Sequence, residues 1–221
     1  MAQEQNGRRR EGRPRRGEEL TRQDLGAAAL AVVAEVGASA LTRAAAAERA
    51  GVSVRSTYRL APAMDDLVAA AVTEWQRAWL PPTDTGDWQG DLTRWAEECL
   101  AHMRAYPGLV AASLRMRPEH VEDAATPTVM GAIDLLVRGA GLGVEEAADA
   151  CGVLNMHCLA WELTLDAQDN LSDAVDPRMY EQHLEFRDRG FHRGLRWLIA
   201  GIAADAASCD GDDAPEADTP P

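Results

Sequence analysis

Residues 41–67 of the chain read LTRAAAAERAGVSVRSTYRLAPAMDDL, and this stretch decides the fold. An Ala-rich segment, a turn at residues 51–53 (GVS) and a short second segment come before a break at Pro62. Thr42 and Ser53 suit the N-caps of two consecutive helices, because their hydroxyls accept hydrogen bonds from unpaired backbone N–H groups. Two short helices joined by a tight, glycine-containing turn form a helix-turn-helix unit.

Another helix is predicted immediately before this unit. Thr21 is a favourable N-cap, Asp24 stands where a capping box places its acidic partner, and Gly37 ends the helix. Apolar side chains recur between them at helical spacing, at Leu25, Ala28, Ala29, Val32, Val33 and Val36. The sequence therefore predicts a three-helix domain with a helix-turn-helix unit over residues 20–68.

The second helix of such a unit can lie in the major groove of DNA, and we expect it over residues 54–59. Arg55 can pair with guanine or phosphate, while Ser56 and Thr57 can reach phosphate or a thymine methyl group. The candidate DNA contacts in this domain are Arg43, Ser53, Val54, Arg55, Ser56, Thr57, Tyr58 and Arg59. Any one of these side chains could instead belong to an ordinary solvated helix surface.

Charge is unevenly distributed along the chain, whose formal net charge is −14. Residues 1–59 contain 11 Arg and 7 acidic residues, whereas the remaining 162 residues contain 11 Arg and 29 acidic residues. The first part therefore carries +4 and the second −18. Because the local field of the docking surface governs nucleic-acid binding, an acidic total does not exclude it.

Residues 1–19 are polar and rich in Arg, without helical or strand periodicity, and we expect a flexible arm. Arg13, Arg15 and Arg16 surround Pro14, which disfavours a helix. Extended Arg side chains are attracted to the negative potential of a narrow, A·T-rich minor groove. The arm is thus a candidate minor-groove contact, and the alternative is a disordered solubilising tail.

The N-terminal part of the chain resembles the TetR-type transcriptional repressors. The matching residues are Leu20–Leu25, Gly37–Thr42, Arg49–Ser53, Tyr58-Arg59, Pro62 and Asp65–Leu67. The run at residues 186–202 (FRDRGFHRGLRWLIAGI) also resembles the last helix of the tetracycline-repressor-like branch. The resemblance implies an all-α fold, with an N-terminal DNA-binding domain and a helical domain for ligand binding and dimerisation.

Five positions depart from the family's usual pattern. A Lys is usual where Met64 stands, and a His and an aromatic residue are usual at Leu60 and Ala61. Leu is usual at Ala46 and Thr57, so the small core of the DNA-binding domain has lost volume. Large-to-small changes in a core typically cost about 2–5 kcal/mol each unless neighbours compensate. We favour a repacked domain over a decaying one, because the caps and the turn persist.

Residues 69–206 are expected to form the second domain. The predicted helix over residues 144–166 is apolar nearly all round, and a second apolar helix follows near the C-terminus. Two such helices per subunit suit a four-helix dimer interface, and a two-fold homodimer suits a palindromic operator. Residues 207–221 read as an acidic, disordered tail that should avoid DNA.

A small-molecule effector is expected to bind inside the second domain. Its candidate contacts are Trp95, His102, Met103, Met130, Asp134, Asn155, Met156 and Trp161. Met and Trp side chains suit a hydrophobic, aromatic ligand with a few polar anchors. The polar members of this set could equally be hydrogen-bonded core or interface residues.

No motif in the sequence indicates an enzyme, a cofactor or a metal site. HExxH, phosphate-binding glycine loops and nucleophile elbows are absent, and the four cysteines lack CxxC spacing. We expect no catalytic residues, and a cytoplasmic location, because no signal peptide is visible and no apolar run approaches about 18 residues.

Two functions follow from the sequence. The first is a dimeric, ligand-responsive transcriptional regulator that binds double-stranded DNA, with a hydrophobic effector releasing a repressor from its operator. The alternative is a small-molecule-binding or protein-interaction dimer of the same fold that has lost specific DNA binding. The departures at Leu60, Ala61 and Met64 leave this alternative open.

Overall fold

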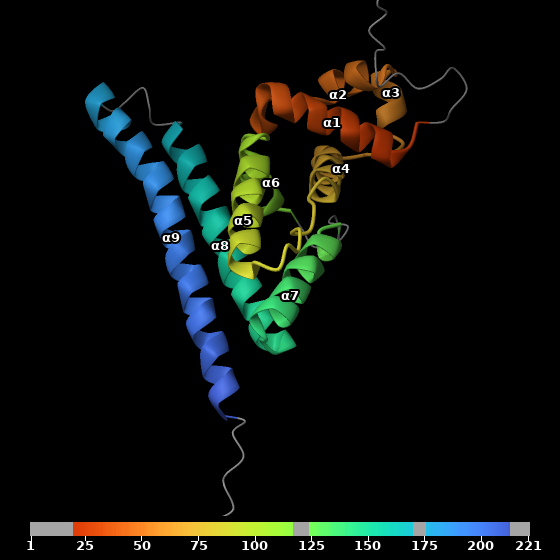
Figure 1. The fold of residues 1–221 in the computed structure, drawn as a ribbon. Helices are drawn as coiled ribbons and strands as arrows, with labels where there is room; N and C mark the ends of the chain where they lie inside the picture. Colours follow the sequence, from red (N-terminus) through yellow and green to blue (C-terminus); the bar gives the residue numbers. More distant parts are fainter. Residues whose placement is uncertain (1–19, 117–123, 170–175, 213–221) are drawn as a thin grey trace, which may run out of the picture.

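The computed structural model describes residues 20–116, 124–169 and 176–212 (Figure 1). These residues form α-helices and one short 3-10 helix, and no strand occurs among them, which confirms the predicted all-α fold. The arm at residues 1–19 and most of the predicted acidic tail lie outside the described residues.

The first helix, α1 (Arg22–Val36), begins and ends where the sequence predicts. The Asp24 backbone N–H donates to the Thr21 hydroxyl over 3.1 Å, and the Thr21 N–H donates to the Asp24 carboxylate over 2.9 Å. This reciprocal pair is a capping box, which satisfies two unpaired donors of the first turn. Gly37 ends the helix at a φ of 79°, and the 3-10 turn η1 (Ala38–Ala40) follows.

The helix-turn-helix consists of α2 (Arg43–Ala50) and α3 (Val54–Thr57). Thr42 and Ser53 are the N-caps, accepting from Ala45 N–H over 3.1 Å and from Ser56 N–H over 3.2 Å. Gly51 has the left-handed conformation, with a φ of 71°, which a glycine adopts without steric penalty. The helix α3 ends at Thr57, two residues before the predicted end at residue 59.

Helix α4 (Met64–Arg77) joins the N-terminal domain of α1, α2 and α3, here called the head, to the rest of the molecule and packs against α1 (Figure 1). Leu67, Ala71 and Trp75 are buried at four-residue spacing on one face of α4. The two helices approach closely at Gly26. A β-carbon on this residue would lie 2.5 Å from the Ala70 carbonyl oxygen, so the crossing has room for a hydrogen atom only.

The second domain comprises α5 (Trp88–Arg104), α6 (Leu109–Ser113), α7 (Thr126–Ala140), α8 (Val144–Asp169) and α9 (Pro177–Asp212). The sequence did not predict the short helix α6. The helix α9 continues to Asp212, so the first six residues of the predicted tail at 207–221 are helical. No helix in the described part of the chain combines the length and apolar character needed to span a bilayer.

The long helices α8 and α9 lie side by side in Figure 1. His157 of α8 stacks on the Phe191 ring of α9 with 5.1 Å between the ring centroids, and its Nε2 lies 3.2 Å from the Phe191 carbonyl oxygen. A β-carbon on Gly194 would lie 2.6 Å from this imidazole. The glycine therefore makes room for His157, as expected of a close helix approach.

Replacing Gly26 tests the α1–α4 crossing. Gly26→Ala should lower the free energy of unfolding by about 1–3 kcal/mol, because the added methyl group forces the two helices apart. Chemical denaturation followed by circular dichroism measures the change. Alanine otherwise favours a helix over glycine by about 1 kcal/mol, so a stabilised variant would contradict this packing. Gln23→Ala, on the exposed face of α1, is the control and should change stability little.

Candidate DNA-binding surface and effector cavity

The outer surface of the helix-turn-helix is formed by α3 and the turn that follows it. Val54, Arg55, Ser56 and Tyr58 are all exposed there. Figure 1 shows α2 and α3 at the end of the molecule opposite to the C-terminal end of α9. This surface is therefore free of packing against the second domain.

The two arginines of this surface, Arg55 and Arg59, differ in their hydrogen bonding. Arg59 donates to the Leu20 carbonyl oxygen over 3.4 Å. No hydrogen bond or ion pair involves Arg55 within the described residues, and its guanidinium is exposed. Ser56 is exposed but shares a 2.8 Å hydroxyl contact with the N-cap Ser53. Arg55 is thus the α3 side chain best placed to meet a phosphate or a base edge.

Thr57 corrects one sequence prediction. Its side chain is fully buried, and its hydroxyl donates to the Val54 carbonyl oxygen over 2.7 Å. In this conformation it belongs to the core of the head and is not presented to a duplex. Ala46 and Ala61 are also fully buried, so the small residues seen in the sequence do occupy core positions.

Arg43 was predicted to contact DNA, but its side chain turns toward the protein. Its guanidinium donates to the Ala61 carbonyl oxygen, to Pro62 O over 3.3 Å and to Ala63 O over 2.8 Å. It also lies over the Tyr58 ring, 4.2 Å from the centroid. Three carbonyl groups of the turn before α4 are thereby satisfied by one side chain, which ties α2 to the start of α4.

The contacts of Arg43 with the three carbonyl groups and with the Tyr58 ring, here called the Arg43 clasp, have two consequences for the exposed surface of α3. It fixes the exposed Tyr58 ring beside α3 through a cation–π contact, a type worth about 0.5–1 kcal/mol at exposed sites. It also uses the positive charge of Arg43 for internal hydrogen bonds. Because Met64 is an exposed apolar residue at the start of α4, the surface gains no charge there either.

Two substitutions distinguish the structural role of Arg43 in the clasp from that of the exposed Arg55. Arg43→Lys should lower the free energy of unfolding by about 1–3 kcal/mol, because a compact ammonium group cannot reproduce the forked geometry with which the guanidinium reaches three carbonyl groups. Arg55→Met, at an exposed position without partners, should leave stability within about 0.5 kcal/mol. Urea denaturation of both variants measures this. Equal stability losses would show that Arg43 is merely another surface arginine.

A cavity of about 160 Å³ lies between the end of α4 and α5. It is lined by Ala78, Trp79, Leu80, Trp95, Glu98, Cys99 and His102. The Trp95 indole N–H donates to the Leu80 carbonyl oxygen over 3.1 Å, which fastens the chain after α4 to α5. Two of the eight predicted effector contacts, Trp95 and His102, therefore meet at this cavity.

His102 is the centre of an aromatic cluster on one side of this cavity. Its ring stacks on Trp75 at 5.9 Å and 7°, and meets Trp79 edge-on at 5.8 Å. Its Nε2 lies 3.0 Å from the Trp75 carbonyl oxygen, which can only accept, so Nε2 carries the proton. Burial lowers the pKa of His102, and the imidazole is therefore neutral near pH 7.

The other predicted effector contacts do not converge with Trp95 and His102. Met130 and Asp134 of α7 and Asn155 and Met156 of α8 have exposed side chains, because both helices bury their opposite faces. Met103 is fully buried in the core. Trp161 packs instead against His157 and Phe191, where α8 meets α9.

Sequence reasoning missed three residues beside the cavity. In the sequence, Trp75 and Trp79 show only a four-residue spacing, and nothing marks Glu98 by itself. A signal for Glu98 is present, because Trp95, Glu98 and His102 recur at spacings of three and four and share one face of α5. Among the described residues, no three His, Cys, Asp or Glu side chains gather where they could hold a metal ion.

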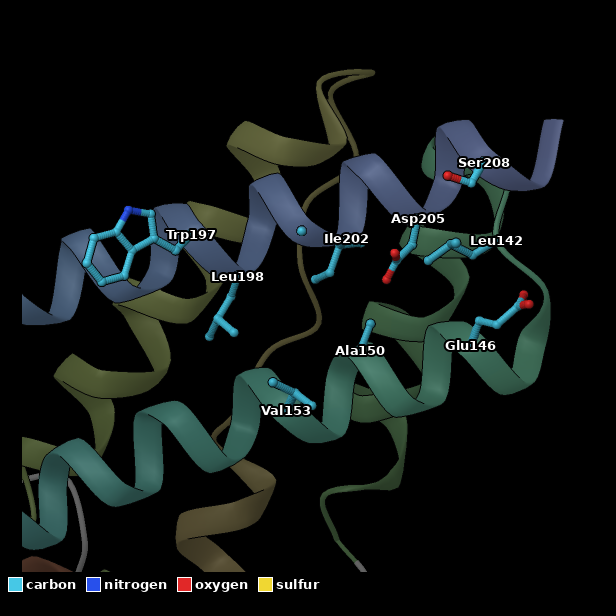
Figure 2. Close-up of a pocket in the computed structure, with 10 residues that line it drawn as sticks. Leu142, Glu146, Ala150, Val153, Trp197, Leu198, Ile202, Asp205 and Ser208 are labelled. Carbon is cyan, nitrogen blue, oxygen red and sulfur yellow. The ribbon is translucent and has the colours of Figure 1, made fainter. Parts of the chain in front are cut away.

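A larger groove of about 570 Å³ runs between α8 and α9 (Figure 2). Ala150 and Val153 of α8 and Leu198 and Ile202 of α9 form its apolar part. Figure 2 shows Trp197 at one end and the carboxylates of Glu146 and Asp205 toward the other. Exposed apolar side chains continue beside the groove, since Met156 is 61% exposed and Trp197 is 69% exposed.

No family model and no curated protein matches the chain. Solved structures match its fold. Apo ActR from Streptomyces coelicolor aligns with a TM-score of 0.67 at 20% identity, over 87% of this chain and 99% of that one. A TetR variant from Acinetobacter baumannii in complex with minocycline aligns with a TM-score of 0.65 at 23% identity, over 85% of this chain and 98% of that one.

BioQ in complex with its double-stranded DNA operator aligns with a TM-score of 0.61 at 18% identity, over 84% of this chain and 99% of that one. All three matches extend through both domains of the chain. The chain therefore has the fold of the TetR-family regulators: an N-terminal helix-turn-helix domain joined to a helical C-terminal domain.

Proposed function

We propose that the chain is a dimeric transcriptional regulator that binds operator DNA and releases it when a small molecule binds. The observation that carries this proposal is the complete, capped helix-turn-helix, whose outer surface at α3 is exposed. The same fold occurs in BioQ, whose structure contains operator DNA, and in a TetR variant bound to minocycline. These structural neighbours give no comparable support for an enzymatic function.

DNA binding would use few residues of the head. Arg55 would reach a base edge or a phosphate from α3, and Tyr58, fixed by Arg43, would pack against the sugar-phosphate backbone. Because Arg43 is turned inward and Met64 is uncharged, the remaining phosphate contacts would fall to the Arg-rich arm at residues 1–19. These assignments make binding strongly dependent on salt.

Dimerisation would use the outer faces of α8 and α9. Val153, Met156 and Trp197 form an exposed apolar surface of a kind that marks protein–protein contacts. A second copy related by a two-fold axis would bury this surface in a four-helix bundle. The two α3 helices would then face two half-sites about one helical turn apart, as a palindromic operator requires.

Release would act through α4. This helix packs on α1 of the head at one end and carries Trp75 near the cavity at the other. A ligand that prefers one position of α4 would shift the population of dimers away from the spacing that fits DNA. A repressor that responds in this way is released from its operator by its effector.

DNA binding is tested by selecting bound duplexes from random sequence and measuring the affinity of the selected duplex. Arg55→Ala should weaken binding by about 1–3 kcal/mol, which is roughly 5- to 150-fold. Deleting residues 1–19, with their 6 Arg and 4 Glu, should weaken binding and make it less dependent on salt. Arg115→Ala, which removes the same charge from the second domain, is the control and should change affinity little.

The alternative function gives a different result in the same experiment. If no duplex is enriched, and binding is weak and equal for all sequences, the chain is a ligand-binding or protein-interaction dimer of this fold. Enrichment without any effect of Arg55→Ala would instead place the recognition surface elsewhere on the head.

A matched pair of substitutions, one on α8 and one on α7, tests the proposed dimer surface. Val153→Glu should convert the dimer to a monomer in sedimentation velocity, because a carboxylate cannot be buried in an apolar interface without a partner. Val129→Glu makes the same change at a similarly exposed valine, 41% against 51%, outside the groove. The Val129 variant should remain dimeric. Equal behaviour of both variants would move the interface away from α8.

A further inference from the structure

The cavity between α4 and α5 has the composition of a cation site. Its walls include the Trp79 and Trp95 indoles and the His102 imidazole, and its one formally charged lining residue is Glu98. Indole faces attract cations through their quadrupole, and a carboxylate at the same cavity supplies a full negative charge. No lysine or arginine lines this cavity.

Glu98 has no cationic partner within the described part of the chain. Neighbouring charges are already used, since Arg94 pairs with Asp91, and Glu97 lies 3.2 Å from His192. Burial is the main cause of the raised pKa of the Cys99 thiol, and the charge of the exposed Glu98 adds to it. An uncompensated carboxylate therefore lies beside an aromatic cavity.

The Cys99, His102 and Trp95 side chains do not compete for this charge, and the Trp79 indole N–H is buried without a hydrogen-bond partner among the described residues. The Cys99 thiol is neutral, since burial is the main cause of its raised pKa. His102 donates its Nε2–H to the Trp75 carbonyl oxygen and repels no cation while it stays neutral. The Trp95 indole N–H is bound to Leu80, so the edge of this ring is fixed.

We propose that this cavity binds a small organic cation, with Glu98 as the anionic anchor and the rings of Trp79 and Trp95 as its walls. This inference rests on the proposed function and specifies the chemical class of the effector. The volume of about 160 Å³ resembles that of an engineered cavity of about 150 Å³ that holds benzene, so a quaternary ammonium head group fits. The carboxylate of Glu98 disfavours an anion at this cavity.

The position of the cavity connects this ligand to the head. Trp79 follows directly on the last residues of α4, and its ring contacts Trp75 edge-on at 5.1 Å between the centroids. A cation between Trp79 and α5 draws the end of α4 toward α5. Because α4 also packs on α1, this movement reaches the helix-turn-helix.

Choline and its uncharged isostere test the site, the isostere being the alcohol with a tert-butyl group in place of the trimethylammonium group. Both are titrated into the full chain without DNA, and the indole N–H resonances are followed by NMR. Choline should shift the Trp79 and Trp95 signals saturably, with a dissociation constant on the order of 1 mM for so small a ligand. The exposed Trp197 indole should stay unchanged.

Charge and rings are then tested separately. Glu98→Gln should weaken choline binding about tenfold and leave the uncharged alcohol unaffected, while Trp79→Leu should weaken choline binding by a similar factor. Glu145→Gln, on the first turn of α8, removes the same charge away from the cavity lining and should change the affinity less than about twofold. Circular dichroism checks that each variant is folded.

Three outcomes overturn the site: no saturable shift at Trp79 or Trp95, equal binding of choline and the alcohol, or unchanged choline binding in Glu98→Gln. Since this titration contains no DNA, its failure leaves the proposed regulator intact. If choline binds as expected and no DNA duplex is enriched, the cation site stands and the regulatory function falls.

Discussion

The close approach of α1 and α4 at Gly26 is the constraint on which the other parts of the structure depend. Only a hydrogen atom fits between this residue and the Ala70 carbonyl oxygen, so the head and α4 form one packed unit. Packed helices have discrete arrangements and resist continuous deformation. In the proposed function, a displacement of α4 near Trp75 would therefore be carried into the head as a rigid movement.

The head shows how a core that lost volume can remain ordered. Thr57 and Ala46 occupy buried positions where the family usually has Leu, and the hydroxyl of Thr57 is satisfied by the Val54 carbonyl oxygen. Arg43 adds hydrogen bonds to three carbonyl groups of the turn before α4. Polar contacts thus replace part of the lost apolar packing, and the same arginine is no longer available to DNA. In the proposed function, the DNA contacts therefore fall to the exposed Arg55 and to the arm at residues 1–19.

Local signals in the sequence predicted the N-caps of the three helices of the head. The caps at Thr21, Thr42 and Ser53 are where the hydrogen bonds require them, since a cap depends on only three or four neighbouring residues. The structure brings only Trp95 and His102 of the predicted effector contacts together at one cavity. Helical periodicity shows that α7 has an apolar face, but neighbouring helices decide which residues turn inward, and Met130 and Asp134 turn outward.

The sequence by itself determined the all-α fold, the helix-turn-helix and the resemblance to the TetR-type repressors, because these depend on local spacing, caps and turns. Only the tertiary structure decided that Arg43 faces inward, that Thr57 is buried and that Glu98 meets Trp79 and Trp95 at one cavity. Such arrangements join residues from helices far apart in the chain. Their geometry follows from how closely whole helices pack, and no local pattern encodes that distance.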